Sequence, residues 1–289
     1  MKTINLSVAL LLLCSCGPGI EECSRVVFSV GLQDKTRATG ISYEDESRIN
    51  RWCICLFRGG SLAGYGFNES SGDISFDLNP GPYYCCAFVN YPEGFLAETV
   101  SSRSLFWETV ENLHGNTLSN FMMAGENTIT VQPGSSDRIS VQVKRLIAKI
   151  GIKKITVSLT NPALRNLGFT LDSIYLTGSG ATMTGSMVSD TGINTQISHG
   201  SSYTEPHYFY ADPSGDAGMV IKASIGGTPC YYCFSLGEVR ANHSYTVNEV
   251  IIRGYGTDGS HDNGSQPDEA EWIIDGQTWG NTYSIDENI

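Results

Sequence analysis

Short apolar runs with a two-residue period recur along this chain and are separated by breaks rich in glycine, proline and asparagine. The first run is Val26-Val27-Phe28-Ser29-Val30-Gly31-Leu32, and Asn79-Pro80-Gly81-Pro82 is the clearest break. A period of two is typical of a β-strand with one buried face, because successive side chains of a strand point to opposite sides. Many short strands at regular spacing predict an all-β protein built from sandwiches.

The length of 289 residues suits one large domain or two ordinary ones. We expect two tandem β-sandwiches, residues 26–144 and 145–289, joined near Val143 to Arg145. One short helix is expected in the N-terminal domain, capped by Ser104. Its buried face would carry Phe106, Val110 and Leu113, which are spaced at i, i+4 and i+7. Strands are expected at residues 49–57, 62–67, 73–78, 83–89, 128–131, 139–143, 146–157, 170–176, 219–225, 230–236 and 245–252.

Charge and composition exclude several classes of protein. The formal net charge is −12, from 18 basic and 30 acidic residues, so the surface repels nucleic-acid phosphates. Only 17% of the residues are charged and 32 are glycines, which does not suit a coiled coil or a helical solenoid. The chain is also too apolar to be disordered. We therefore expect a folded protein that does not bind nucleic acid.

The first 15 residues are typical of a bacterial export signal. Lys2 provides the positive charge, and the apolar run that follows is too short to span a bilayer as a helix. The signal ends in Leu13-Cys14-Ser15-Cys16, which resembles the motif that directs a diacylglycerol onto a cysteine. We expect Cys16 to be lipidated and to begin the mature chain, with residues 16–25 as a tether. The alternative is an ordinary signal with an incidental cysteine.

The remaining cysteines of the predicted domains all lie in apolar or aromatic runs. In a strand, Cys53 and Cys55 share a face, whereas Cys85 and Cys86 face opposite sides. Buried thiols are one possibility, and one or two cross-strand disulfides are another, because exported proteins fold in an oxidising compartment. A metal or redox site is less favoured, because the single Cys-x-x-Cys lies in strand-like sequence. The six cysteines concerned are Cys53, Cys55, Cys85, Cys86, Cys230 and Cys233.

No catalytic motif stands out. The formal G-x-G-x-x-G at residues 254–259 has no helix after it to bind a pyrophosphate. The five histidines are scattered, and the acidic residues of 258–269 do not have the spacing of an EF-hand loop. We therefore expect a protein that is not an enzyme and needs neither a cofactor nor a metal.

Three segments resemble the fimbrillins of the Bacteroidales, a family that includes type V pilins and Mfa-like proteins. Residues 81–92, GPYYCCAFVNYP, are similar to a family strand of the form G-x-Y-x-apolar-x-A-x-x-N-x-P. Residues 121–125, FMMAG, and the later Arg145, Ala148 and Lys149 are similar to a second family block. Cysteines stand where the family has aliphatic residues. The resemblance implies two transthyretin-like sandwiches and a stalk, accessory or tip subunit of a fimbrium on the outer membrane.

The resemblance also implies how such a subunit assembles. An Arg-specific protease would cut between Arg37 and Ala38 and remove the lipid together with the first strand. Another subunit would then add a strand to the vacated groove, which is β-strand addition. The removable strand would carry Val26, Phe28, Val30 and Leu32, and the donor candidate at the other end of the chain carries Trp272, Ile274, Trp279, Tyr283 and Ile285.

Several alternatives remain open from the residues alone. Arg37 could be a basic residue in a linker, and the C-terminal segment could be an ordinary last strand. A fimbrial anchor would stay uncut. A surface lipoprotein of another class could bind glycans on its sandwich, and Trp107, Trp272, Trp279 and the 14 tyrosines would supply the aromatic platform.

Overall fold

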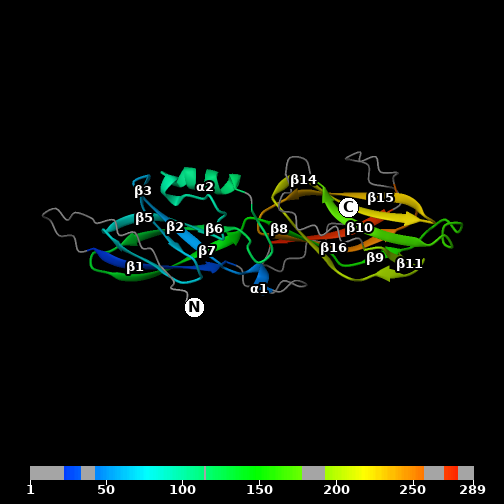
Figure 1. The fold of residues 1–289 in the computed structure, drawn as a ribbon, viewed down its shortest axis with the longest axis horizontal. Helices are drawn as coiled ribbons and strands as arrows, with labels where there is room; N and C mark the ends of the chain where they lie inside the picture. The colour runs from blue at the N-terminus through cyan, green and yellow to red at the C-terminus, as the bar shows by residue number, and fades with distance from the viewer. Residues whose placement is uncertain (1–22, 34–42, 114, 178–192, 257–269, 279–289) are drawn as a thin grey trace, which may run out of the picture. The chain divides into compact units, whose positions relative to one another are not determined.

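The computed structural model describes residues 23–33, 43–113, 115–177, 193–256 and 270–278 (Figure 1). These residues form two compact units, 23–146 and 147–278. The expected boundary between residues 144 and 145 lies within two residues of this division. Both units consist almost entirely of strands, which confirms the predicted all-β class. The short helix expected in the first unit is present at Arg103–Asn112, and a further helix of four residues, Tyr43–Glu46, was not expected. Among the described residues, no helix has the length and apolar character needed to cross a membrane.

The strands of the first unit form one continuous seven-stranded sheet, in the order β3-β2-β5-β6-β7-β1-β4. Strands β6 and β7 are paired only at Met123–Arg145 and Ala124–Lys144, and at this short pairing the sheet folds over into the second layer of the sandwich. The layers face each other where Ile74 and Phe76 of β4 pack over Gly66 of β3. The strands are β1 (Ser24–Leu32), β2 (Trp52–Arg58), β3 (Ser61–Asn68), β4 (Ile74–Leu78), β5 (Gly81–Val89), β6 (Met123–Val131) and β7 (Ser136–Arg145).

Strand β2 from Trp52 to Phe57 and strand β5 from Cys85 to Val89 are buried on both faces, which explains their continuous apolar sequences. One face of each looks into the sandwich. The other face is covered by helix α2 (Arg103–Asn112) and the 3-10 helix η1 (Ala97–Thr99), as Figure 1 shows for α2 above these strands. This second apolar layer includes Cys53, Cys55, Phe57, Cys86, Phe88, Phe106 and Val110.

Helix α2 begins two residues earlier than the sequence predicted. Ser102, rather than Ser104, is its N-cap, and the Ser102 hydroxyl accepts a hydrogen bond of 3.2 Å from the amide of Leu105. Phe106 and Val110 form the buried face as expected. The side chain of Glu126 on β6 fixes the helix to the sheet, because it accepts hydrogen bonds from the Arg103 guanidinium and, at 2.8 Å, from the Trp107 indole.

The second unit contains two sheets around one apolar core. The four-stranded sheet has the order β11-β10-β14-β15. In the other sheet, β16 runs parallel to both β8 and β9 along one edge and antiparallel to β17 along the other. The strands are β8 (Ala148–Ile152), β9 (Ile155–Val157), β10 (Phe169–Thr177), β11 (Thr195–Ile197), β12 (Ser202–Tyr203), β13 (His207–Ala211), β14 (Ser214–Ile225), β15 (Thr228–Val239), β16 (His243–Ile252) and β17 (Ala270–Thr278).

The Glu126 contacts predict a pH-dependent contribution of α2 to stability. Hydrogen bonding to Arg103 lowers the pKa of Glu126 from its ordinary value of 4.5. Because the pKa is lower in the folded state, the stabilisation is complete above pH 4.5 and is lost as the pH falls through the folded pKa. We expect Glu126→Gln to reduce the free energy of unfolding by about 1 kcal/mol at pH 7, since the side chain is partly exposed.

Denaturant unfolding of both proteins between pH 7 and pH 3 would measure this difference. Glu108→Gln is the matched control, because Glu108 lies on the exposed side of the same helix. An equal effect of the two substitutions at pH 7, or a Glu126→Gln deficit that persists at pH 3, would contradict the assignment.

Candidate functional site

The first strand, β1, lies in the interior of its layer although it comes at the N-terminal end of the described chain. It pairs in parallel with β7 over eight register positions, from Arg25–Ser136 to Leu32–Val143. On its other side it pairs antiparallel with β4 over five positions, from Ser24–Leu78 to Phe28–Ile74. Among the described strands, β4 has no other neighbour in the sheet. The layer β7-β1-β4 therefore depends on β1 to exist as a sheet.

The inward face of β1 fills the sandwich. Val26 and Phe28 are fully buried, Leu32 is 9% exposed, and Val30 is half-buried. The ring of Phe28 contacts that of Phe76 on β4 edge to face, with 5.8 Å between centroids. Burying a side chain of this size stabilises a fold by roughly 1.5–3 kcal/mol. Loss of β1 would consequently remove several kcal/mol of burial in addition to the backbone hydrogen bonds on both of its edges.

Both ends of β1 are tied to the segment that carries β7. The amide of Arg25 donates to the carbonyl of Ser135 at 3.1 Å, and that of Gln33 donates to Val143 at the same distance. The buried Ser24 hydroxyl donates to the Gln132 carbonyl and accepts from the amide of Ser135. Strand β1 is therefore bonded to the segment of β7 along its whole length.

The predicted modification sites lie outside the described residues. Cys16 precedes them, and Arg37 and Ala38 fall between Gln33 and the short helix α1 (Tyr43–Glu46). Lipidation at Cys16 and cleavage after Arg37 therefore stay predictions. The described chain resumes at α1, which begins five residues after Ala38.

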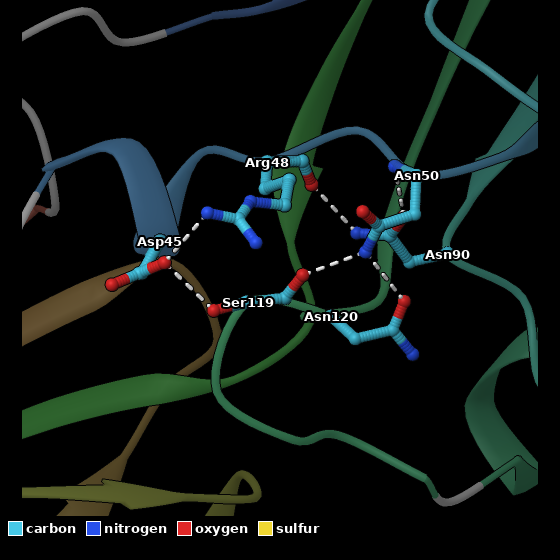
Figure 2. A network of polar contacts seen from close by, with 6 residues as sticks. All are labelled: Asp45, Arg48, Asn50, Asn90, Ser119 and Asn120. Carbon is cyan, nitrogen blue, oxygen red and sulfur yellow. Dashed lines mark hydrogen bonds and ion pairs between the residues drawn. The ribbon is translucent and has the colours of Figure 1, made fainter.

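Asn90, from the first fimbrillin-like segment, is the centre of a polar network (Figure 2). It follows β5 with a φ of 53°, a conformation that asparagine tolerates better than most residues. Its Oδ1 accepts from the amide of Asn50 at 2.9 Å, and its Nδ2 donates to the carbonyls of Arg48 and Phe121 at 2.8 and 2.9 Å. One side chain thus joins three separate segments of the first unit.

Other residues of the fimbrillin-like segments also have structural roles. The Tyr83 hydroxyl donates to the carbonyl of Asn79 at 3.0 Å across the turn before β5. Gly125 lies against the main chain of Gln142, so that any side chain there would overlap it. The buried Arg145 donates through Nε to the main-chain carbonyl of Glu46 at 2.9 Å. The resemblance therefore rests on positions that shape the fold rather than on a reactive group.

The donor candidate is only partly described. Residues 270–278 form β17, whose register along β16 places Trp272 opposite Val250 and Ile274 opposite Val247. Trp279, Tyr283 and Ile285 lie outside the described residues. In this structure β17 is the last strand of its own unit and pairs with β16 along one edge, which agrees with the plainer alternative. Its use as a donor to another subunit stays a prediction.

The described cysteines are free thiols and do not make a redox or metal motif. Cys53, Cys55 and Cys86 lie together beneath α2, whereas Cys85 is buried but not part of that cluster. Cys230 points into the core and Cys233 points outward from β15, so the two face opposite sides of one strand. Within the described ranges, no cluster of three or more His, Cys, Asp or Glu side chains could hold a metal ion.

The aromatic residues proposed for glycan binding are mostly occupied in the fold. Trp107 packs against the layer beneath α2 and donates its indole N–H to Glu126. Tyr84 is exposed, but the guanidinium of Arg103 lies over its ring at 5.2 Å. For Trp272 the structure gives only the strand position, and Trp279 lies outside the described residues. Trp107 and Tyr84 therefore already have partners within the fold, whereas Tyr255 is a second exposed tyrosine.

No family model and no curated protein matches this sequence. Solved structures do match. A fimbrilin from Porphyromonas gingivalis W83 has a TM-score of 0.60 at 14% identity, covering 92% of this chain and all of that one. A fimbrial assembly protein from Parabacteroides distasonis has a TM-score of 0.52 at 13% identity, covering 87% and 94% of the two chains. The tip fimbrial protein Mfa3 from P. gingivalis has a TM-score of 0.50 at 13% identity, covering 89% and 99%. These similarities establish the fold and confirm the structural resemblance expected from the sequence.

The burial of the thiols predicts their reactivity. Burial raises the pKa of Cys55 and of Cys85 to about 12, so neither forms an appreciable amount of reactive thiolate at pH 8. In residues 17–289, we expect iodoacetamide at pH 8 to modify Cys23 quickly, Cys233 slowly, and the five buried thiols not at all. In denaturant without reductant, all seven should react. Intact and peptide mass would show this, and fewer than seven modified cysteines in denaturant would contradict the free-thiol state.

Proposed function

We propose that this protein is a subunit of a fimbrium, exported as a lipoprotein precursor and assembled by exchange of its first strand. The observation that carries the proposal is the position of β1, which is terminal in the chain but central in its layer, between β4 and β7. The solved structures of similar fold support it, because they include a fimbrilin, a tip fimbrial protein and a fimbrial assembly protein.

Proteolysis after Arg37 would convert β1 from part of the fold into a separate segment. Its departure would expose the facing edges of β7 and β4, each with unpaired N–H and C=O groups. It would also expose the apolar core residues against which Val26 and Phe28 pack. A strand from another subunit restores both the hydrogen bonds and the burial, so the free energy of the cut state favours association.

The surfaces that donate and accept a strand differ, so the contact is heterologous and extends into a filament rather than closing into a dimer. The C-terminal segment that begins with Trp272 and Ile274 is the proposed donor. The partners are then neighbouring fimbrial subunits, an Arg-specific protease and, through Cys16, the outer membrane. The protein would be located at the cell surface, first at the membrane and then in the fimbrium, as a stalk or an accessory or tip subunit.

The proposal predicts one early cut and a change of assembly state. We expect an Arg-specific protease to act on residues 17–289 first after Arg37, giving a chain that begins at Ala38. Intact mass would identify the product, and electron microscopy with native gels would detect filaments or oligomer ladders. Arg37→Gln is the matched control: it should not give the product that begins at Ala38 and should stay monomeric, because the neighbouring Lys35 is not a substrate of such a protease.

A product cut after Arg37 that stays a folded monomer at high concentration would contradict assembly by strand exchange. Resistance of Arg37 to the protease, with cleavage elsewhere, would contradict the proposed processing site. Filaments formed equally by the Arg37→Gln protein would show that assembly does not depend on loss of β1.

A further inference from the structure

We propose that a polar clamp holds the chain just after the processing site to the body of the first unit, so that loss of β1 does not release it. We name this network the Asn90 clamp. Its members are Asp45, Arg48, Asn50, Asn90, Ser119 and Asn120 (Figure 2). The inference rests on the proposed function, because it concerns what happens to the new N-terminal segment once β1 has been cut away.

The clamp attaches residues 45–50 at two points. The first is Asn90, which bonds to the amide of Asn50 and to the carbonyl of Arg48. The second is the turn before β6, where the Asn50 Nδ2 donates to the carbonyl of Ser119 at 2.6 Å and to Asn120 Oδ1 at 3.0 Å. The side chain of Asp45 accepts from the Ser119 hydroxyl at 2.8 Å and pairs with Arg48 at 3.0 Å.

A third attachment lies beside the clamp. Glu46 is fully buried at the end of α1, and its main-chain carbonyl accepts from Nε of Arg145, which is 1% exposed. Arg145 is the last residue of β7, two positions beyond Val143, where the pairing with β1 ends. Residues 45–50 are therefore bonded directly to the end of β7, and this bond does not involve β1.

None of these attachments uses a residue of β1. Asn90 follows β5, and Ser119 and Asn120 precede β6. Arg145 is the last residue of β7, where it pairs with Met123 of β6. The strands β2, β5 and β6 form ladders with one another that do not include β1. Removing β1 therefore leaves every bond of the clamp with both partners still present.

The consequence concerns the groove. After cleavage, residues 38–51 would be the new N-terminal segment. Without the clamp, this segment would be long enough to fold back towards the place that β1 has left. Its unfolding would also extend into β2, which begins at the buried Trp52. The clamp holds residues 45–50 in place whether or not β1 is present. The clamp thus keeps the acceptor groove open for a strand from another subunit and keeps β2 folded.

Hydrogen exchange would test this without depending on Arg37. A recognition site for a sequence-specific protease is inserted after Arg37 in residues 17–289, and the folded protein is cut. Peptides covering residues 44–52 are then compared before and after cleavage by mass spectrometry. We expect their protection to be retained in the cut protein. Asn50→Ala, a surface substitution that removes both Nδ2 bonds, should make exchange there about tenfold faster in the cut protein.

The matched control is Asn68→Ala, because Asn68 also bonds a loop at the surface, through Nδ2 to the carbonyl of Asp73. It should leave exchange at residues 44–52 unchanged. The proposal is overturned if residues 44–52 lose protection on cleavage of the unsubstituted protein, or if Asn50→Ala and Asn68→Ala act alike there. A cut protein that retains protection at residues 44–52 but never forms filaments supports the clamp and contradicts the proposed function.

Discussion

Pairing of β1 with two strands at once is the interaction on which the first unit depends. Apart from β1, strand β7 pairs only with β6, at two register positions, and among the described strands β4 pairs only with β1. The layer β7-β1-β4 is therefore held together by the first described strand of the chain. If β1 were lost, the facing edges of β7 and β4 would be left unpaired, and the proposed assembly by strand exchange depends on this property of the architecture.

The remaining features of the unit favour survival of the rest of the fold through that loss. Strands β2, β5 and β6 have a second apolar layer beneath α2, so their burial does not depend on the opposite layer alone. The Asn90 side chain, just after β5, donates hydrogen bonds to the segments that precede β2 and β6. Arg145 bonds the end of β7 to α1. Asn90 and Arg145 are among the positions that make the sequence resemble fimbrillins, and their contacts are structural rather than reactive.

Local patterns sufficed to predict much of this structure. The alternation from Val26 to Leu32 predicted the buried face of β1, and the spacing of Phe106 and Val110 predicted the face of α2. What depends on distant partners could not be predicted. The central position of β1 follows from non-local pairing, and the short strand β13 was missed because its pairing with β8, rather than any period of its own, defines it. The N-cap was placed at Ser104, because Ser102 and Ser104 are locally equivalent. Of the candidate site, the inward residues of β1 were found, whereas the Asn90 network was not, since its members are up to about 70 residues apart.

The most direct test of the central claim is whether the groove of the cut protein binds a free strand. A fluorescent peptide with the sequence of residues 24–33 would be titrated into the cut protein after the native β1 segment has been removed, with anisotropy as the readout. The account predicts saturable binding that is abolished by Phe28→Asp in the peptide and little affected by Val27→Asp, because Phe28 lies on the buried face of β1 and Val27 lies on the opposite face. A folded cut protein that does not bind the peptide, or binds both variants equally, would contradict the account.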